Sequence, residues 1–119
     1  MSIKVMVVDD STFMRNMLKN LITQFGAQVV GEAVDGNDAV VKYGQLRPDL
    51  VFMDIMMPNK NGLDALKDII KADKNAKVIM CTSVGQDKVT TEAVESGASD
   101  FIVKPFKPED IKGVIEKFS

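Results

Sequence analysis

Several side chains that could take part in chemistry come directly after short apolar runs of the sequence, namely Asp9, Asp10, Asp54, Thr82 and Lys104. Nearly continuous apolar runs are typical of strands buried on both faces of a parallel sheet, whose carboxyl ends share one edge. Because neighbouring strands lie about 4.8 Å apart, the three carboxylates would repel one another unless a cation lay between them. Mg²⁺ prefers such oxygen ligands, and a lysine and a hydroxyl can hold the remaining oxygens of a phosphoryl group. The set therefore predicts a phosphoryl site that depends on Mg²⁺.

These side chains need a sheet to bring them together, and the rest of the sequence predicts one. Apolar runs indicate strands at residues 3–8, 27–32, 50–53, 77–81 and 100–103. Apolar residues at helical spacing indicate helices at residues 14–25, 37–46, 63–72, 86–96 and 108–118. Ser11 is the expected N-cap of the first helix, Gly26 its end, and Arg15 lies on its polar side.

The strict alternation of strands and helices favours an α/β fold, a three-layer (βα)5 sandwich of the flavodoxin-like kind around a parallel five-stranded sheet. The strand order 2-1-3-4-5 is already known for such sheets and is expected here on that ground. Ligands of these folds bind outside the carboxyl ends of the strands, where the order reverses between strands 1 and 3. The acidic residues lie at that point.

The composition is that of one globular domain over residues 1–119, with 45% apolar and 27% charged residues. The sequence has no histidine, which excludes imidazole as a base, a metal ligand or a carrier of phosphoryl groups. Its one cysteine, Cys81, excludes an internal disulfide and indicates a buried, inert thiol in a reducing cytoplasm. The net charge of −2 argues against nucleic-acid binding. No apolar segment is typical of a membrane helix or a signal peptide.

Four motifs at the expected strand ends resemble one known family, the response-regulator receiver domains. They are VVDDSTFMR at residues 7–15, MDIMMPNKNG at 53–62, MCTS at 80–83 and GASDFIVKPF at 97–106. The resemblance covers essentially the whole chain, and within the family it is strongest to the free-standing regulators of chemotaxis. One acid pair or one Lys-Pro step is weak evidence, whereas four motifs in order on successive strands are highly specific.

The resemblance implies that Asp54 accepts a phosphoryl group from a phosphohistidine on a chemotaxis-type sensor histidine kinase. It also implies a Mg²⁺ ion bound by Asp10, Asp54 and the backbone carbonyl of Met56, and by Asp9 either directly or through water. Charge neutralisation of this kind suits the loose transition state of phosphoryl transfer. Such a protein is a stand-alone response regulator of a two-component system and not an enzyme, although it assists its own phosphorylation and dephosphorylation.

The resemblance further implies that Lys104 and Thr82 hold the phosphoryl oxygens and that the peptide bond between Lys104 and Pro105 is cis. Thr82 would also couple to an aromatic side chain that rotates inward on phosphorylation and changes an output surface on the last two helices and the last strand. Chemotaxis regulators commonly have tyrosine at that switch position, whereas this chain has Phe101. Because a phenyl ring has no hydroxyl to offer solvent, we expect it to prefer the inward rotamer even without phosphorylation.

Two more positions depart from many relatives. In the family, the residues two after the phosphoacceptor and two after the threonine influence the hydrolytic water, and here they are Met56 and Val84. Neither side chain can orient a water molecule by hydrogen bonding, so we expect slow autodephosphorylation relative to relatives with Asn and Glu there.

The sequence ends one helix after the Lys-Pro step, so we expect no effector domain and an output by docking to another protein. The expected target is a motor-switch or adaptor protein, and the other expected partners are the kinase and a phosphatase. We expect a monomer in the cytoplasm, with no nucleic acid bound and no membrane insertion.

Other classes of protein share parts of this pattern. A phosphorelay shuttle, or a receiver domain cut from a longer regulator, would use the same residues. A Mg²⁺-dependent phosphatase of the haloacid-dehalogenase kind has a nucleophilic aspartate in a similar sheet, but it needs D-x-D after the first strand. An FMN-binding flavodoxin needs a loop rich in hydroxyls and glycine there, and Asp9 and Asp10 would repel its phosphate. A P-loop enzyme needs G-x-x-x-x-G-K-[ST], which the sequence lacks, and a structural scaffold needs no acidic cluster.

Overall fold

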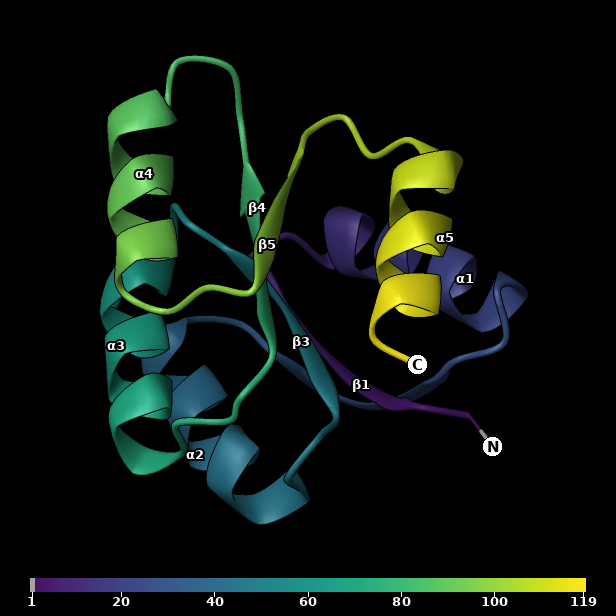
Figure 1. Cartoon of the computed structure of the whole chain (residues 1–119), viewed down its shortest axis with the longest axis horizontal. Coiled ribbons are helices and arrows are strands. Elements are labelled where there is room, and N and C mark those ends of the chain that lie inside the picture. Colours follow the sequence, from purple (N-terminus) through teal and green to yellow (C-terminus); the bar gives the residue numbers. More distant parts are fainter. Residues whose placement is uncertain (1) are drawn as a thin grey trace.

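The computed structural model of the chain describes residues 2–119 as a parallel sheet between two layers of helices (Figure 1). The elements come in this order: β1 (Lys4–Val8), α1 (Thr12–Gln24), β2 (Gln28–Ala33), α2 (Gly36–Leu46), β3 (Leu50–Asp54), α3 (Gly62–Ala72), β4 (Val78–Thr82), α4 (Asp87–Glu95), β5 (Asp100–Val103) and α5 (Pro108–Lys117). The strand order is β2-β1-β3-β4-β5, and all neighbouring strands are parallel. The predicted fold class and strand order are therefore confirmed. Within residues 2–119, no helix has the length and apolar character needed to cross a membrane.

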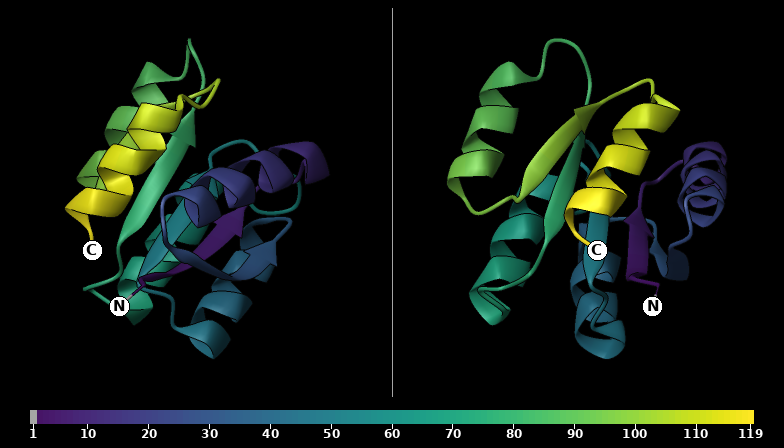
Figure 2. Two further views of the ribbon diagram at one scale, coloured as in Figure 1. Left: turned by 90° about the vertical axis from the view of Figure 1, so that its right-hand side faces the viewer. Right: turned by 45° about the vertical axis from the view of Figure 1, so that its right-hand side comes forward.

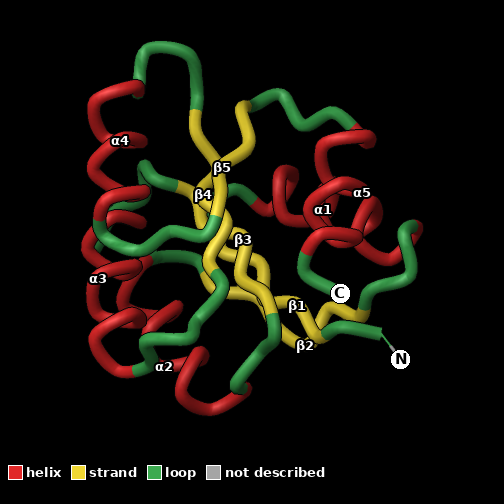
Figure 3. The backbone as a smooth tube through the Cα atoms, viewed as in Figure 1, coloured by secondary structure: helices red, strands yellow, loops and turns green. Residues whose placement is uncertain are grey.

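The three central strands, β1, β3 and β4, are buried on both faces, which explains their nearly continuous apolar runs. Helices α1 and α5 cover one face of the sheet, and α2, α3 and α4 cover the other (Figures 1 and 3). Side chains of β1 alternate between the two layers, so Val5 and Val7 belong to the core under α1 and α5. Met6 and Val8 belong to the core under the other three helices. Because both faces of these strands are buried, the polar candidate residues lie only at the strand ends.

Polar caps determine where the chain leaves this edge of the sheet and enters the first three helices. The hydroxyl of Ser11 accepts a hydrogen bond from the backbone N–H of Met14 at 3.2 Å, as predicted for an N-cap. Asp35 caps α2 in the same way, and Asn61 caps α3. Each cap satisfies a backbone donor that the helix itself cannot pair. The caps therefore fix the residue at which each of these helices begins.

The edge strand β5 lies between α4 and α5 (Figures 1 and 2). Helix α4 is the least apolar of the helices in sequence, and only Thr90 and Ala93 of its residues are buried. It therefore covers β5 incompletely, and the side chains of Phe101 and Val103 are 45% and 41% exposed. This side of β5 is therefore open to solvent.

Candidate functional site

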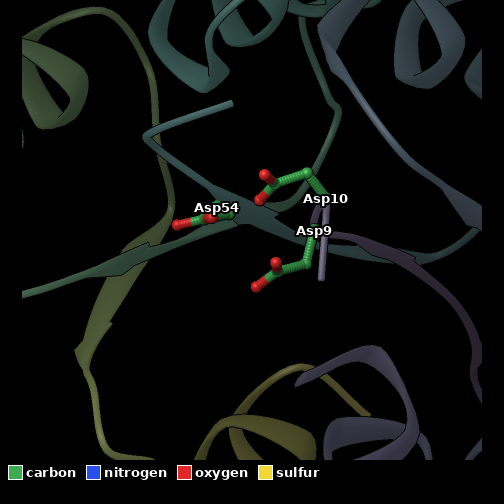
Figure 4. A group of neighbouring side chains, drawn as sticks. All are labelled: Asp9, Asp10 and Asp54. Carbon is green, nitrogen blue, oxygen red and sulfur yellow. The ribbon is translucent and has the colours of Figure 1, made fainter. Parts of the chain in front are cut away.

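Four strands bring the candidate residues to one edge of the sheet. Asp9 and Asp10 come after β1, and Lys104 comes after β5. Asp54 is the last residue of β3 and Thr82 the last of β4, so each strand ends one residue later than predicted. Carboxylate oxygens of the three aspartates lie within 4.8 Å of one another (Figure 4). Parallel pairing of the strands thus assembles a cluster from positions far apart in the sequence.

Lys104 is the cation of this cluster. Its ammonium group donates to Asp9 Oδ2 at 2.9 Å and lies 3.2 Å from Asp54 Oδ1. Its backbone N–H donates to the carbonyl of Thr82 at 2.7 Å, which ties the end of β5 to the end of β4. The peptide bond to Pro105 is cis, as the resemblance implied. One lysine therefore bridges two of the three carboxylates.

The two adjacent aspartates have different surroundings. Asp9 is 3% exposed, and its Oδ1 accepts the backbone N–H of Ser11 at 2.9 Å while its Oδ2 accepts from Lys104. The side chain of Asp10 is exposed, and within the described residues its carboxylate has no hydrogen bond or ion pair. Asp10 is thus the acid with both oxygens available to a ligand.

The electrostatics of the cluster show a deficit of positive charge. Burial raises the pKa of Asp54, which is 8% exposed, and the charges of Asp9 and Asp10 raise it further. Lys104 opposes this change but does not cancel it, so the pKa of Asp54 stays above its ordinary value. Burial alone would lower the pKa of Lys104, but its hydrogen bond to Asp9 and the charges of both carboxylates outweigh burial and raise it. A further cation near the cluster would relieve this repulsion.

The donor set fits Mg²⁺. It consists of carboxylate oxygens only, which hard cations prefer, and one of the three carboxylates is unpaired and exposed among the residues that the structure describes. The loop after β3 is held against the strand end, because the N–H of Gly62 donates to the carbonyl of Ile55 at 2.8 Å. A Cβ atom on Gly62 would overlap the backbone carbonyl of Asp54. Met56, whose backbone carbonyl is the expected fourth protein ligand, lies in this same loop with its side chain 64% exposed.

The predicted switch residues lie beside a groove of about 550 Å³ between the end of β4, α4 and β5. Thr82, Val84, Val94 and Phe101 are among the residues that line it. Thr82 is buried, whereas Val84, in the loop after β4, is 91% exposed. The expectation of an inward Phe101 is wrong in this structure, because the ring lies at the surface and is 45% exposed. The short buried face of α4 leaves this side of β5 open, so the ring is not forced inward by lack of a hydroxyl.

Cys81 is 2% exposed, and burial raises the pKa of its thiol, as expected for an inert residue. One residue near the site was not singled out from the sequence. Arg15, which helical periodicity places only on a polar face, has a side chain that is 11% exposed and donates to the carbonyl of Asp9 at 2.6 Å. Its place in the first turns of α1 could have indicated this contact. Helical side chains lean toward the N-terminus of their helix, so a long side chain there can reach back to the end of β1.

Comparison with known proteins identifies the class. The family model of the response regulator receiver domain matches residues 5–116. The chain therefore belongs to the family of response regulator receiver domains, which are signalling domains. Within this family it is similar to the receiver domains of CheY-type chemotaxis response regulators.

Individual relatives support this assignment. The chain is 52% identical over 116 residues to the chemotaxis protein CheY of Thermotoga maritima, covering 98% of this chain and 97% of that protein. It is 44% identical over 117 residues to CheY of Bacillus subtilis, covering 98% of each. Among solved structures, CheY in a CheX–CheY–BeF3–Mg²⁺ complex from Borrelia burgdorferi superposes with a TM-score of 0.92 at 35% identity, covering 98% of this chain and 90% of that one. The response regulator domain of Thermotoga maritima CheB gives 0.86 at 42% identity, covering 99% and 94%. These matches favour neither a haloacid-dehalogenase-like phosphatase nor a flavodoxin.

Proposed function

We propose that residues 1–119 form a single receiver domain that acts as a stand-alone response regulator of a chemotaxis two-component system. Asp54 accepts a phosphoryl group from a histidine kinase, and the phosphorylated protein signals by docking to another protein. The observation that carries this proposal is the cluster itself, in which Lys104 bridges Asp9 and Asp54 while Asp10 has no partner among the described residues. A phosphoacceptor needs such a buried nucleophile with cationic support and an open ligand beside it.

In the proposed reaction a carboxylate oxygen of Asp54 attacks the phosphorus of a phosphohistidine on the kinase. The new O–P bond forms as the P–N bond breaks, and the electron pair of the broken bond remains on the histidine nitrogen. The histidine belongs to the partner, because this sequence contains none. The products are an acyl phosphate on this chain and a histidine on the kinase.

Each residue at the edge has a proposed part in this transfer. The carboxylates of Asp9, Asp10 and Asp54 and the carbonyl of Met56 would hold Mg²⁺, which when bound neutralises charge on the phosphoryl oxygens. Lys104 moves its ammonium group toward a phosphoryl oxygen. The hydroxyl of Thr82 donates to another.

The proposed output surface consists of α4, β5 and α5. Phe101 lies on it beside the groove that also contains Thr82, so movement of the threonine toward a phosphoryl group changes the space open to the ring. The expected docking partners are a motor-switch or adaptor protein, with a phosphatase that resets the signal. The support for chemotaxis is the similarity to relatives named chemotaxis protein CheY along almost their whole length. A free, buried Cys81 is compatible with a reducing cytoplasm, where we place this signalling.

The test is modification by a small phosphoryl donor. Wild-type protein is incubated with acetyl phosphate and Mg²⁺, and the added phosphoryl group is detected by intact-protein mass spectrometry. Asp54→Asn should lose the modification, and omission of Mg²⁺ should prevent it. Asp49→Asn is the matched control, because this exposed aspartate lies just before the opposite end of the same strand, β3. Persistent modification of Asp54→Asn, or repeated turnover of added phosphoesters, would contradict the proposal.

A further inference from the structure

The side chain of Arg15 connects the start of α1 to the ends of two strands. Its Nη1 donates to the backbone carbonyl of Asp9 at 2.6 Å, and its Nε donates to Glu32 Oε1 at 3.0 Å. Its Nη2 donates to the hydroxyl of Thr12 at 3.2 Å. Although it belongs to the polar side of α1, the side chain is only 11% exposed. A planar guanidinium can reach three acceptors in this way, whereas an ammonium group cannot span them at once.

Glu32 is itself held in place from several sides. Lys19, one turn after Arg15 on α1, donates to Glu32 Oε2 at 2.8 Å. Lys42 of α2 donates to the backbone carbonyl of the same residue. The hydrogen bond from Lys19 lowers the pKa of Glu32, and Arg15 lowers it further, so the carboxylate remains charged. The guanidinium therefore has a fixed anionic partner on β2.

The contact with Asp9 is important because Asp10 is the next residue of the chain. The carbonyl of Asp9 lies in the same planar peptide unit as the N–H of Asp10, so a donor that holds this carbonyl also holds the start of Asp10. The side chain of Asp10 has no partner of its own among the described residues. The orientation of this peptide unit therefore sets the backbone position from which the side chain of Asp10 extends toward Asp54.

We propose that Arg15, oriented by Glu32, is a positioning residue that sets the Mg²⁺ affinity of the site through the peptide unit between Asp9 and Asp10. This inference rests on the proposed function, because it assumes that the three aspartates hold Mg²⁺. The direction of the change in Mg²⁺ affinity on removal of Arg15 distinguishes positioning from charge. A positive group near a cation site weakens cation binding by repulsion, whereas a group that places a ligand strengthens it.

The experiment measures Mg²⁺ dissociation constants by isothermal titration calorimetry on the whole chain. One variant is Arg15→Lys, which keeps the positive charge but lacks the planar guanidinium group. The other is Arg15→Met, which lacks both. Both should bind Mg²⁺ about 10- to 100-fold more weakly than wild type, the usual range for loss of a residue that orients a metal ligand. Lys19→Met is the control, because it removes the other cation bound to Glu32 but leaves the bonds from Arg15 to Glu32 Oε1 and to the Asp9 carbonyl in place. Its Mg²⁺ dissociation constant should stay within about twofold of wild type.

Urea denaturation of each variant in EDTA separates this role from a purely structural one. Loss of stability with an unchanged Mg²⁺ dissociation constant would overturn the inference, since Arg15 would then only stabilise the fold. Wild-type Mg²⁺ affinity in Arg15→Lys would overturn it as well, because the positive charge would then suffice without the guanidinium group. Tighter binding by Arg15→Met would show that repulsion dominates and overturn it too. If wild-type protein bound no Mg²⁺, the proposed function would fail along with this inference.

Discussion

Substitution of Asp10 by Asn should stabilise the protein without Mg²⁺ and lose that advantage when Mg²⁺ is added. Asp10 lies with Asp9 and Asp54 in a cluster whose ligand oxygens are within 4.8 Å of one another, a separation at which two unit charges in water repel by about 0.9 kcal/mol. Because Asp10 is exposed, a dielectric constant near that of water applies to its repulsion by Asp9 and by Asp54. Part of this repulsion is offset by the nearby charge of Lys104. We therefore expect Asp10→Asn to raise the free energy of unfolding in EDTA by about 1 kcal/mol.

Added Mg²⁺ should reverse the order of the two proteins. A ligand at about 100 times its dissociation constant stabilises the folded state by about 2.7 kcal/mol, which exceeds the advantage expected for the variant. Asp10→Asn, which lacks a carboxylate ligand, should gain much less from the same concentration. Urea denaturation monitored by circular dichroism, in EDTA and in Mg²⁺, measures both differences.

Glu116→Gln is the control for the loss of one negative charge. Glu116 is exposed in the last turn of α5, which runs away from the aspartate cluster, and the free energy of unfolding of this variant should differ from wild type by less than about 0.5 kcal/mol in either buffer. The reasoning is refuted if Asp10→Asn is no more stable than wild type in EDTA. It is also refuted if Mg²⁺ stabilises both proteins equally, because Asp10 would then not be a ligand.

Three further predictions concern residues around Asp54. The double substitution Met56→Asn with Val84→Glu should shorten the lifetime of the acyl phosphate at least about tenfold, measured as loss of phosphorylated mass after removal of the donor; an equal lifetime would show that neither position controls water. The raised pKa of Asp54 favours its protonated form in the folded state, so the stability of metal-free wild type relative to Asp54→Asn should fall as pH rises from the ordinary value of 3.8 through the raised pKa. Urea denaturation of both proteins across this range checks the sign, and a difference that grew with pH would contradict it. Gly62→Ala should destabilise the protein by about 1–3 kcal/mol, because its Cβ atom would overlap the backbone carbonyl of Asp54; unchanged thermal unfolding would mean that the loop can move aside.

The sequence predicted the layers and the edge of the sheet because both depend on local patterns. Continuous apolar runs distinguish buried strands, helical spacing identifies the segments between them, and strict alternation leaves few topologies. Asp9, Asp10, Asp54 and Lys104 could then be placed at one edge, since parallel strands end together. Boundaries were less secure, because Asp54 and Thr82 still pair within their strands although they are polar.

Contacts between side chains required the tertiary structure. Nothing local indicated that Lys104 would contact Asp9 as well as Asp54, or that Arg15 would leave the polar face of its helix to hold the Asp9 carbonyl and Glu32. The outward position of Phe101 likewise depends on how much of β5 is covered by α4, which belongs to another part of the chain. The residues that reach the edge of the sheet could be named from the sequence, because each strand forms from a short-range pattern of polarity and parallel strands end together. Which of these residues touch depends on the tertiary structure, because each side chain takes its orientation from neighbours that other elements bring to it.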